Sequence, residues 1–346
     1  MPLSASVPRS TDLAFALPAL RFPARWTGLG LAAVLALACA GWPAGAFAAE
    51  RGGATRGRRP NGRADKDRLY VTDLDGTVIF KGRPLPVYSQ KAMNLFVRRG
   101  WQLGVATGRN ELEMRRVLGD VRLALPVMLL HGALTKNLET GEILRVAAVS
   151  RRMQRVIARE ADRHGVCLVA TVLRPDGTVV GEYKPHPLRE AVEYIEGLRR
   201  TLSVQEVRGP LGAAGGKVLM LTAEGPDARL DGFREAVAKA LPKLQVYPGT
   251  HSVSGKLVEF TAPGASKGQA TRSLAKSMGL TMRQVTGFGD EVNDLSLART
   301  AGRYFAVETG NPALLGVTRG RLPGPQQQGV ASYLARLLRQ AAVGAR

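Results

Sequence analysis

Two aspartates separated by one residue, Asp73 and Asp75, follow an apolar run and precede a glycine in the string Asp73-Leu-Asp75-Gly76-Thr77. Side chains two apart on a strand point to the same face, and a turn at Gly76 lets both carboxylates reach one small volume. One carboxylate can then attack an electrophile while the other handles protons. Paired aspartates also occur in metal-binding elements of glycosyltransferases and in ordinary turns, so the prediction depends on the full string after an apolar strand.

Three later strings offer groups that suit phosphoryl transfer. Each also has a plainer interpretation: the first could be a common turn, the second could carry a solvated lysine, and the third could be a loop of helix-capping residues. Phosphoryl transfer needs in-line positioning and neutralisation of the phosphate charge, and a hard Mg²⁺ takes oxygen ligands. A strand-end hydroxyl, a lysine and a set of carboxylates meet those needs together. The strings are Gly104-Val-Ala-Thr107-Gly108-Arg109, Gly264-Ala-Ser-Lys267-Gly268 and Gly287-Phe-Gly289-Asp290-Glu-Val-Asn293-Asp294.

From about Arg68 onward, apolar runs alternate with helical patterns, which is typical of an α/β protein with a parallel sheet. Ligands of such sheets bind beyond the carboxyl ends of the strands, where the reactive residue types fall. The sequence therefore predicts that the four strings meet at one sheet edge. Strands are expected at 69–72, 101–106, 126–130, 283–287 and 303–307, and helices at 89–98, 111–117, 267–278, 294–299 and 330–338.

A second set of elements lies between about residues 150 and 250, and roughly 100 residues are enough for a domain. Helices are expected at 151–163, 187–201 and 228–240, and strands at 167–173, 178–184, 204–208 and 217–222.

The four strings, in this order, resemble the motifs of the haloacid dehalogenase-like superfamily over residues 68 to 340. The resemblance implies a Rossmann-like parallel sheet core with an inserted α/β cap, and a phosphatase that works through an aspartyl-phosphate with Mg²⁺. It implies that Asp73 is the nucleophile and that Asp75 is the acid and base. The metal ligands would be Asp73, Asp290 and the backbone carbonyl of Asp75. Thr107, Gly108 and Lys267 would hold the phosphoryl group, and Asn293 and Asp294 would orient the ligands around them.

The long insertion between Thr107 and Lys267 resembles the Cof-type branch, which includes sucrose-phosphate and mannosyl-phosphoglycerate phosphatase-like enzymes. Leu257-Val-Glu259-Phe260 and Gly329-Val330-Ala331 add to that resemblance. It implies a small phosphorylated metabolite as substrate, a sugar or polyol phosphate above all.

The chain departs from this branch at His131-Gly132-Ala133, where Asn-Gly-Ala is usual. His131 could alter substrate contacts or cap a strand, and we favour the cap. Four polar residues of the insertion could face the phosphate, but each is expected to be a solvated surface residue: Arg174, Lys184, His186 and Lys217.

The segment 1–49 is expected to be a targeting signal, followed by a flexible basic linker at 50–67. No charge occurs from Trp26 to Ala49, the run 28–40 is apolar, and Ala46-Phe47-Ala48 suits cleavage before Ala49. We therefore expect export to the periplasm or outside. Organelle targeting, an uncleaved membrane anchor and a cytoplasmic protein with a mis-set start remain open. The rest divides into a first core segment (68–149), a cap domain (150–250) and a second core segment (251–346).

The net charge of +21 and the isoelectric point of about 10.8 would ordinarily suggest nucleic acid or anionic membranes as partners. Residues 1–67 carry nine Lys and Arg against four Asp and Glu, so +16 remains on the rest. No nucleic-acid partner is expected, because aromatic interleaving and a known binding module are missing. Membrane contact is expected only with an uncleaved N-terminal segment. Two other functions stay open: a phosphotransferase or phosphomutase, and a basic, non-catalytic membrane or nucleic-acid binding protein.

Overall fold

The computed structural model describes residues 67–80, 83–213, 215–251, 255–318 and 320–343. The expected targeting segment and nearly all of the basic linker lie outside these residues and stay predictions. In the part of the chain that the structure describes, no helix has both the length and the apolar character needed to cross a membrane.

A parallel sheet forms the core, and within the described residues its strand order is β14-β13-β12-β1-β2. Its strands are β1 (Leu69–Thr72), β2 (Gln102–Val105), β12 (Val285–Gly289), β13 (Arg303–Val307) and β14 (Gly320–Leu322). Thr72 pairs with Val105 on one side and with Phe288 on the other. The residues that follow these strands therefore lie at the same level of one sheet edge.

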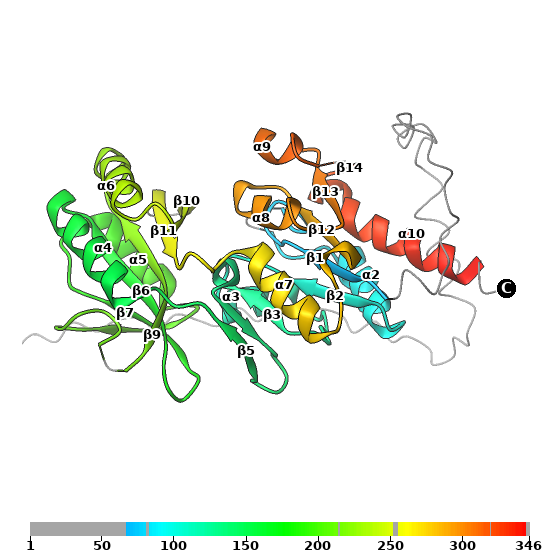
Figure 1. Ribbon diagram of the computed structural model, residues 1–346, viewed down its shortest axis with the longest axis horizontal. Helices are drawn as coiled ribbons and strands as arrows, with labels where there is room; N and C mark the ends of the chain where they lie inside the picture. The colour runs from blue at the N-terminus through cyan, green and yellow to red at the C-terminus, as the bar shows by residue number, and fades with distance from the viewer. Residues whose placement is uncertain (1–66, 81–82, 214, 252–254, 319, 344–346) are drawn as a thin grey trace, which may run out of the picture. The chain divides into compact units, whose positions relative to one another are not determined.

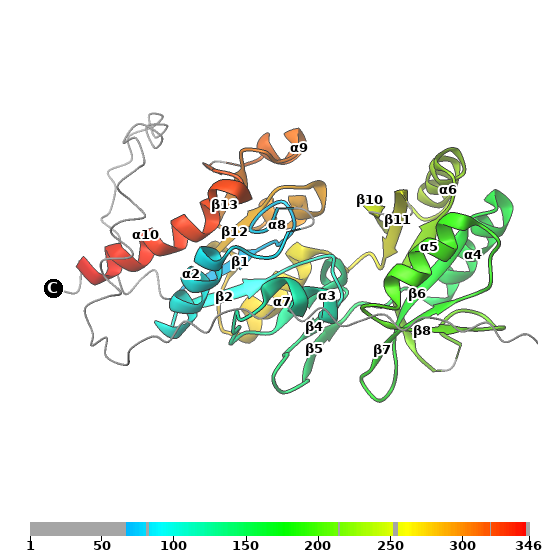
Figure 2. The ribbon, with the colours of Figure 1, turned by 180° about the vertical axis from the view of Figure 1, so that it is seen from behind.

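Helices cover both faces of this sheet (Figure 1). Alternate residues of β1 point to opposite faces, so Tyr70 packs with α2 (Val87–Arg98) and α10 (Gly329–Val343), whereas Leu69 and Val71 pack with α7 (Lys267–Ser277) and α8 (Leu295–Ala298). The views from front and back both show α2 beside α10 (Figure 2). The result is a three-layer α/β/α core, which confirms the expected fold class.

The strand expected at 126–130 contacts the parallel core sheet and also belongs to a small antiparallel sheet. β3 (Val127–Leu129) joins β2 through one parallel bridge, Ala106 to Met128, and pairs antiparallel with β4 (Leu134–Lys136). β5 (Ile143–Val146) completes that small sheet. Two further short helices, α3 (Glu111–Leu118) and α9 (Pro312–Leu315), lie in loops that connect core strands.

The inserted segment has its own sheet, whose order among the described residues is β10-β11-β9-β6-β7-β8. Helices α4 and α6 pack on one face and α5 on the other. The expected boundary at residue 250 falls inside β10, and the pairing of β11 carries the sheet on to Thr261. Its elements are α4 (Arg151–His164), β6 (Cys167–Leu173), β7 (Val179–Tyr183), α5 (Arg189–Leu198), β8 (Ser203–Glu206), β9 (Lys217–Glu224), α6 (Asp227–Ala240), β10 (Gln245–His251) and β11 (Gly255–Thr261).

Candidate active site

Asp73 is the first residue after β1, at the carboxyl edge of the core sheet. The residue is only 5% exposed, and its backbone N–H donates to the carbonyl of Phe288 in the next strand (3.0 Å). The hydroxyl of Thr72 donates to the backbone carbonyl of Asp73 (2.7 Å). These bonds fix the backbone at Asp73, so its carboxylate extends from a rigid strand end.

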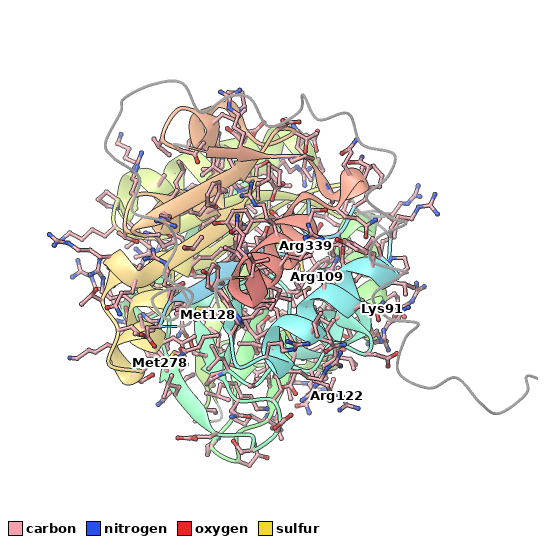
Figure 3. All side chains as sticks on the ribbon, turned by 90° about the vertical axis from the view of Figure 1, so that its right-hand side faces the viewer. Lys91, Arg109, Arg122, Met128, Met278 and Arg339 are labelled. Carbon is pink, nitrogen blue, oxygen red and sulfur yellow. The ribbon has the colours of Figure 1, made fainter. Side chains whose placement is uncertain are left out.

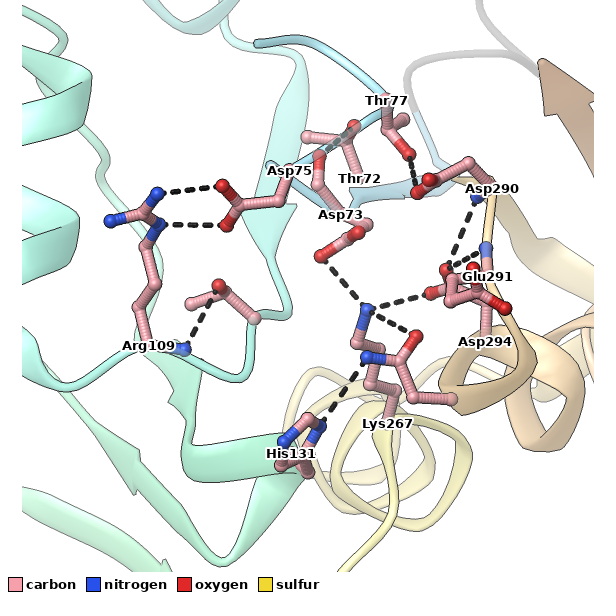
Figure 4. Close-up of polar contacts among 12 residues, drawn as sticks. Thr72, Asp73, Asp75, Thr77, Arg109, His131, Lys267, Asp290, Glu291 and Asp294 are labelled. Carbon is pink, nitrogen blue, oxygen red and sulfur yellow. Dashed lines mark hydrogen bonds and ion pairs between the residues drawn. The ribbon is translucent and has the colours of Figure 1, made fainter. Parts of the chain in front are cut away.

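Lys267 is the first residue of α7 and is completely buried. Its Nζ lies 2.8 Å from Oδ1 of Asp73 and 2.9 Å from Oδ1 of Asp294, and it donates to Oδ1 of Asn293 at 3.3 Å (Figure 4). An ammonium group has three protons to donate, and these three oxygens accept them all. Lys267 is thereby held against Asp73 from a different element of the core.

Asp294 and Asp290 lie in the loop after β12. Oδ2 of Asp294 accepts the backbone N–H groups of Asp290 and Glu291, both at 3.2 Å, while its Oδ1 accepts from Lys267. Oδ1 of Asp290 accepts the hydroxyl of Thr77 at 2.8 Å. Both oxygens of Asp294 are therefore engaged within the protein, as the orienting role expected for it requires.

Burial sets the protonation equilibria of this cluster. It raises the pKa of Asp73 well above its usual range, with Lys267 opposing the rise and the charges of Asp294 and Asp290 adding to it. Burial together with Asp294 raises the pKa of Asp290 to about 6, against the lowering effect of the Thr77 hydroxyl. Burial alone would lower the pKa of Lys267, but Asp294 and Asp73 raise it, so Lys267 stays charged.

The carboxylates of Asp73, Asp290 and Asp294 form an acidic cluster of the kind that could hold a metal ion. Each has an oxygen within 4.8 Å of the others. When ionised, three carboxylates and one ammonium leave a local charge of −2. Burial is the main cause of the raised pKa values of Asp73 and Asp290, and the neighbouring carboxylates add to the rise. A divalent cation with oxygen ligands matches this donor set in both charge and chemistry.

Asp75 lies apart from this cluster and pairs with Arg109. The guanidinium donates from Nε to one carboxylate oxygen (2.7 Å) and from Nη2 to the other (2.6 Å). Such a bidentate pair fixes the orientation of both groups. Sequence reasoning gave Arg109 no role of its own, although its place beside Thr107 and Gly108 could have indicated one.

Thr107 and Gly108 follow β2 at the same sheet edge as Asp73. Thr107 is fully buried, its N–H donates to the carbonyl of Met128, and its hydroxyl oxygen accepts the N–H of Arg109 (3.2 Å). The hydroxyl proton of Thr107 is thus still available to an oxygen of a substrate. Gly108 lies against the ring of His131, and a Cβ at this position would meet Cε1 of that ring at 2.6 Å.

His131 does more than the strand cap that the sequence favoured. It is buried, and its ring contacts Glu259 and Asn293. In the sequence, the departure from Asn-Gly-Ala was the one indication that His131 has a special role. Its contacts with Glu259 and Asn293 are visible only in the structure.

Within the residues that the structure describes, the four polar residues singled out in the insertion make no polar contact with these groups. Lys184 and Lys217 are exposed, Arg174 bonds to Gln205, and Nδ1 of His186 accepts the N–H of Leu188. Their expected place on the surface of the insertion agrees with these contacts.

A pocket of about 740 Å³ lies beyond Asn110, between α3 and the end of α5. Among the described residues that line it, neither Asp73 nor Lys267 occurs. The pocket is therefore separate from the cluster of Asp73 and Lys267 at the sheet edge.

Known proteins are similar to this chain in sequence and in fold. A family model described as haloacid dehalogenase-like hydrolase matches residues 70–334. The HMP-PP phosphatase of Cronobacter sakazakii is 27% identical over 257 residues, which cover 72% of this chain and 86% of that protein.

Two solved structures are similar over 78% of this chain. A haloacid dehalogenase-like hydrolase from Bacteroides thetaiotaomicron, 19% identical, aligns over 99% of its own length with a TM-score of 0.64. A sugar phosphatase of subclass IIB, 17% identical, aligns over 98% of its length with a TM-score of 0.61. At these identities the likeness establishes a shared fold.

Proposed function

The chain belongs to the haloacid dehalogenase-like hydrolases, and from that membership we propose that it is a Mg²⁺-dependent phosphatase that forms an aspartyl-phosphate on Asp73. The observation that carries the proposal is the buried contact of 2.8 Å between Asp73 and Lys267 at the sheet edge. A carboxylate that attacks a phosphate dianion meets like-charge repulsion, and a fixed ammonium beside both groups reduces it.

The first step forms one bond and breaks another at phosphorus. An oxygen of Asp73 attacks in line, and the bond from phosphorus to the leaving oxygen breaks. Asp75 supplies the proton that the leaving oxygen takes. In this structure both oxygens of Asp75 accept bonds from Arg109, so Asp75 must leave the guanidinium and take up a proton from water before it can act as the acid.

The second step returns the enzyme to its starting state. Asp75, now a carboxylate, takes a proton from water while the water oxygen attacks phosphorus. The bond between Asp73 and phosphorus then breaks, which releases inorganic phosphate and restores the carboxylate. Lys267 exchanges one of its three protein oxygens for a phosphoryl oxygen, and with the Thr107 hydroxyl it holds the phosphoryl group through both steps.

Asp73, Asp290 and the backbone carbonyl of Asp75 would hold the Mg²⁺. When bound, the metal would offset the charge on the phosphoryl oxygens and the carboxylates around them. Asp294 and Asn293 would act through Lys267, since both accept its protons.

The substrate we propose is a small phosphorylated metabolite, with a sugar or polyol phosphate foremost. The inserted sheet supports a substrate whose leaving group is selected by a separate segment of chain. The phosphatase names of the two relatives above, for HMP-PP and for a sugar phosphate, agree with this size class.

A direct test is phosphate release from p-nitrophenyl phosphate by the full chain with Mg²⁺. Asp73→Asn keeps the shape of the side chain but removes the nucleophile, so we expect the rate to fall by about a thousandfold or more. Equal rates in the wild type and the Asp73→Asn variant would reject the mechanism.

Adding sugar acceptors to the same assay separates a phosphatase from a phosphotransferase. A phosphatase releases all of the phosphate to water, whereas a phosphotransferase or mutase yields a newly phosphorylated sugar. Chromatography of the sugars after complete turnover distinguishes the two.

A further inference from the structure

His131 occupies a backbone position that few residue types adopt. Its φ of +57° and ψ of +20° lie in the left-handed region, which favours glycine, asparagine, aspartate and histidine. Its backbone N–H donates to the carbonyl of Thr107 (3.0 Å), which ties it to the loop that follows β2. Both asparagine and histidine suit this backbone, so the choice of histidine has to be explained by its ring.

Three contacts fix that ring. Its Nε2 lies 2.8 Å from Oε2 of Glu259, on strand β11. Its Nδ1 lies 3.4 Å from Nδ2 of Asn293, in the loop after β12 (Figure 4). Its plane stacks on Tyr247 of β10, with ring centroids 4.1 Å apart and an angle of 22°. The ring therefore connects the inserted sheet to the loop that carries the site carboxylates.

The partners assign the donors and acceptors along this connection. A carboxylate only accepts, so Nε2 of His131 carries a proton toward Glu259 and Nδ1 is left to accept from the amide of Asn293. The other end of that amide, Oδ1, accepts a proton from Lys267 (3.3 Å). Each end of Asn293 thus has the partner its chemistry requires, and the amide is held in one orientation.

The connection ends at the proposed nucleophile. Lys267 donates to Asn293 and Asp294 and contacts Oδ1 of Asp73 at 2.8 Å. Four hydrogen bonds therefore run from Glu259 through His131, Asn293 and Lys267 to Asp73. If the ring is removed, the amide of Asn293 can rotate, and Lys267 loses one of the three oxygens that define its direction.

We propose that His131 is a positioning residue for phosphoryl transfer: held by Glu259, it orients Asn293 and through it sets Lys267 against Asp73. This inference rests on the proposed function. It also connects strand β11 of the inserted sheet to the reacting carboxylate through four successive hydrogen bonds. The shorter side chain of asparagine at this position would keep the backbone conformation but lose the reach to Glu259 and the stacking on Tyr247.

The test uses the full chain, p-nitrophenyl phosphate and Mg²⁺, with His131→Asn and His131→Ala as the variants. Loss of a residue that orients a catalytic group costs about tenfold to a hundredfold in activity. We expect kcat to fall by that factor in both variants while KM changes little, because the alignment matters most in the transition state. The matched control is His164→Ala. The ring of His164 contacts Phe233 within the inserted segment, with ring centroids 6.3 Å apart, so its removal tests the loss of a histidine ring elsewhere in the chain.

A double-mutant cycle separates positioning from simple packing. If His131 acts through Asn293, then His131→Ala combined with Asn293→Ala lowers kcat little more than the worse single substitution. Orthovanadate should raise the Tm of these variants less than it raises the Tm of the wild type, because Lys267 is no longer aligned to contact the bound vanadate. Losses that multiply would overturn the inference.

An unchanged kcat in a folded His131→Asn protein would equally overturn it, and so would an equal effect of His164→Ala. Failure of the proposed function looks different, because the wild type would then release no phosphate or would release it equally after Asp73→Asn.

Discussion

Lys267 supplies a positive charge to a cluster that would otherwise hold uncompensated buried carboxylates. Asp73 and Asp294 lie within 2.9 Å of its Nζ, and both are almost completely buried, as is Lys267. Breaking a buried pair by removing one partner is costly, because the remaining charge stays away from water. The same side chain therefore serves stability and, in the proposed mechanism, catalysis.

Lys267→Met is expected to lower both properties. We expect kcat/KM to fall by about a hundredfold to a thousandfold, as for the loss of one charge-stabilising donor. Without Mg²⁺, the free energy of unfolding at neutral pH should fall by about 3 to 5 kcal/mol. Urea unfolding and steady-state kinetics measure the two effects.

The matched control is Lys276→Met, because Lys276 lies on the same helix and is exposed. It should leave both measurements unchanged. A Lys267→Met protein with normal activity would contradict the assignment of Lys267.

The raised pKa of Asp290 predicts how Mg²⁺ binding depends on pH. With its pKa near 6 in the folded protein, above its ordinary value of 3.8, Asp290 binds more protons folded than unfolded between those two values. The metal-free protein should therefore lose stability as pH rises through that window. Mg²⁺ needs the carboxylate, so its binding should release protons and strengthen as pH rises past 6.

Thermal unfolding with and without Mg²⁺ at about pH 5 and about pH 7.5 checks this. We expect the larger rise in Tm at the higher pH, and a smaller difference between the two pH values after Asp290→Asn. An equal rise at both pH values in the wild-type protein would show that Asp290 does not titrate with the metal.

The turn after β1 brings two elements into close contact at Gly76. Its φ is +76°, and a Cβ there would lie 1.9 Å from Oδ2 of Asp290. Only glycine both adopts this positive φ easily and leaves room for the Asp290 carboxylate. This turn therefore sets the distance between the loop after β1 and the loop after β12.

Gly76→Ala should displace Asp290 and lower activity by about a hundredfold, the usual effect of a 1 Å misplacement in an active site. The matched control is Gly279→Ala, where φ is +70° but no atom lies within 4 Å of the added Cβ. The control should lose about 1 kcal/mol of stability and keep its activity. Equal losses of activity in both variants would mean that the backbone strain, and not the contact with Asp290, causes the effect.

Local patterns in the sequence were sufficient to predict most of the helices and most of the core strands that the structure contains. The apolar run 69–72 and the helical pattern at 267–278 correspond to β1 and α7. Three of the four strings follow β1, β2 and β12, parallel strands that end at a shared edge, so their residues had to converge; Lys267 reaches the same edge from the first turn of α7.

The sequence did not predict features that depend on long-range pairing. β4 and β5 are short strands, and the hairpin of β10 and β11 joins the inserted sheet only through the pairing of β11 with β9. The pair of Asp75 and Arg109 spans 34 positions, and that of His131 and Glu259 spans 128. Nothing in the local pattern indicates which of many basic residues will meet a given carboxylate.

For the chain as a whole, the large positive charge and the acidic site are separate features. Exposed basic residues such as Lys91, Arg122 and Arg339 lie on the surface of the molecule (Figure 3). The charges of the cluster around Asp73 sum to −2. The positive surface can raise the local concentration of an anionic substrate, while in the proposed mechanism neutralisation of the transferred group depends on Lys267 and a bound cation.

We propose that the N-terminal segment directs export and is removed before Ala49. The uncharged run from Trp26 to Ala49 and the small residues Ala46 and Ala48 motivate this. N-terminal sequencing of the protein from its native cells should begin at Ala49, and a protein that still begins at Met1 would reject the cleavage.

The central claim is that Asp73 carries the phosphoryl group between the two steps. In Asp75→Asn, p-nitrophenyl phosphate can still transfer its phosphoryl group, because its leaving group needs no proton. The later attack by water slows, because the base is missing. Acid quenching within the first turnover, followed by mass spectrometry of the peptide that contains Asp73, measures the intermediate directly. We expect that peptide to gain the mass of one phosphoryl group at Asp73. An unmodified Asp73 in enzyme that releases p-nitrophenol would contradict covalent transfer to this residue.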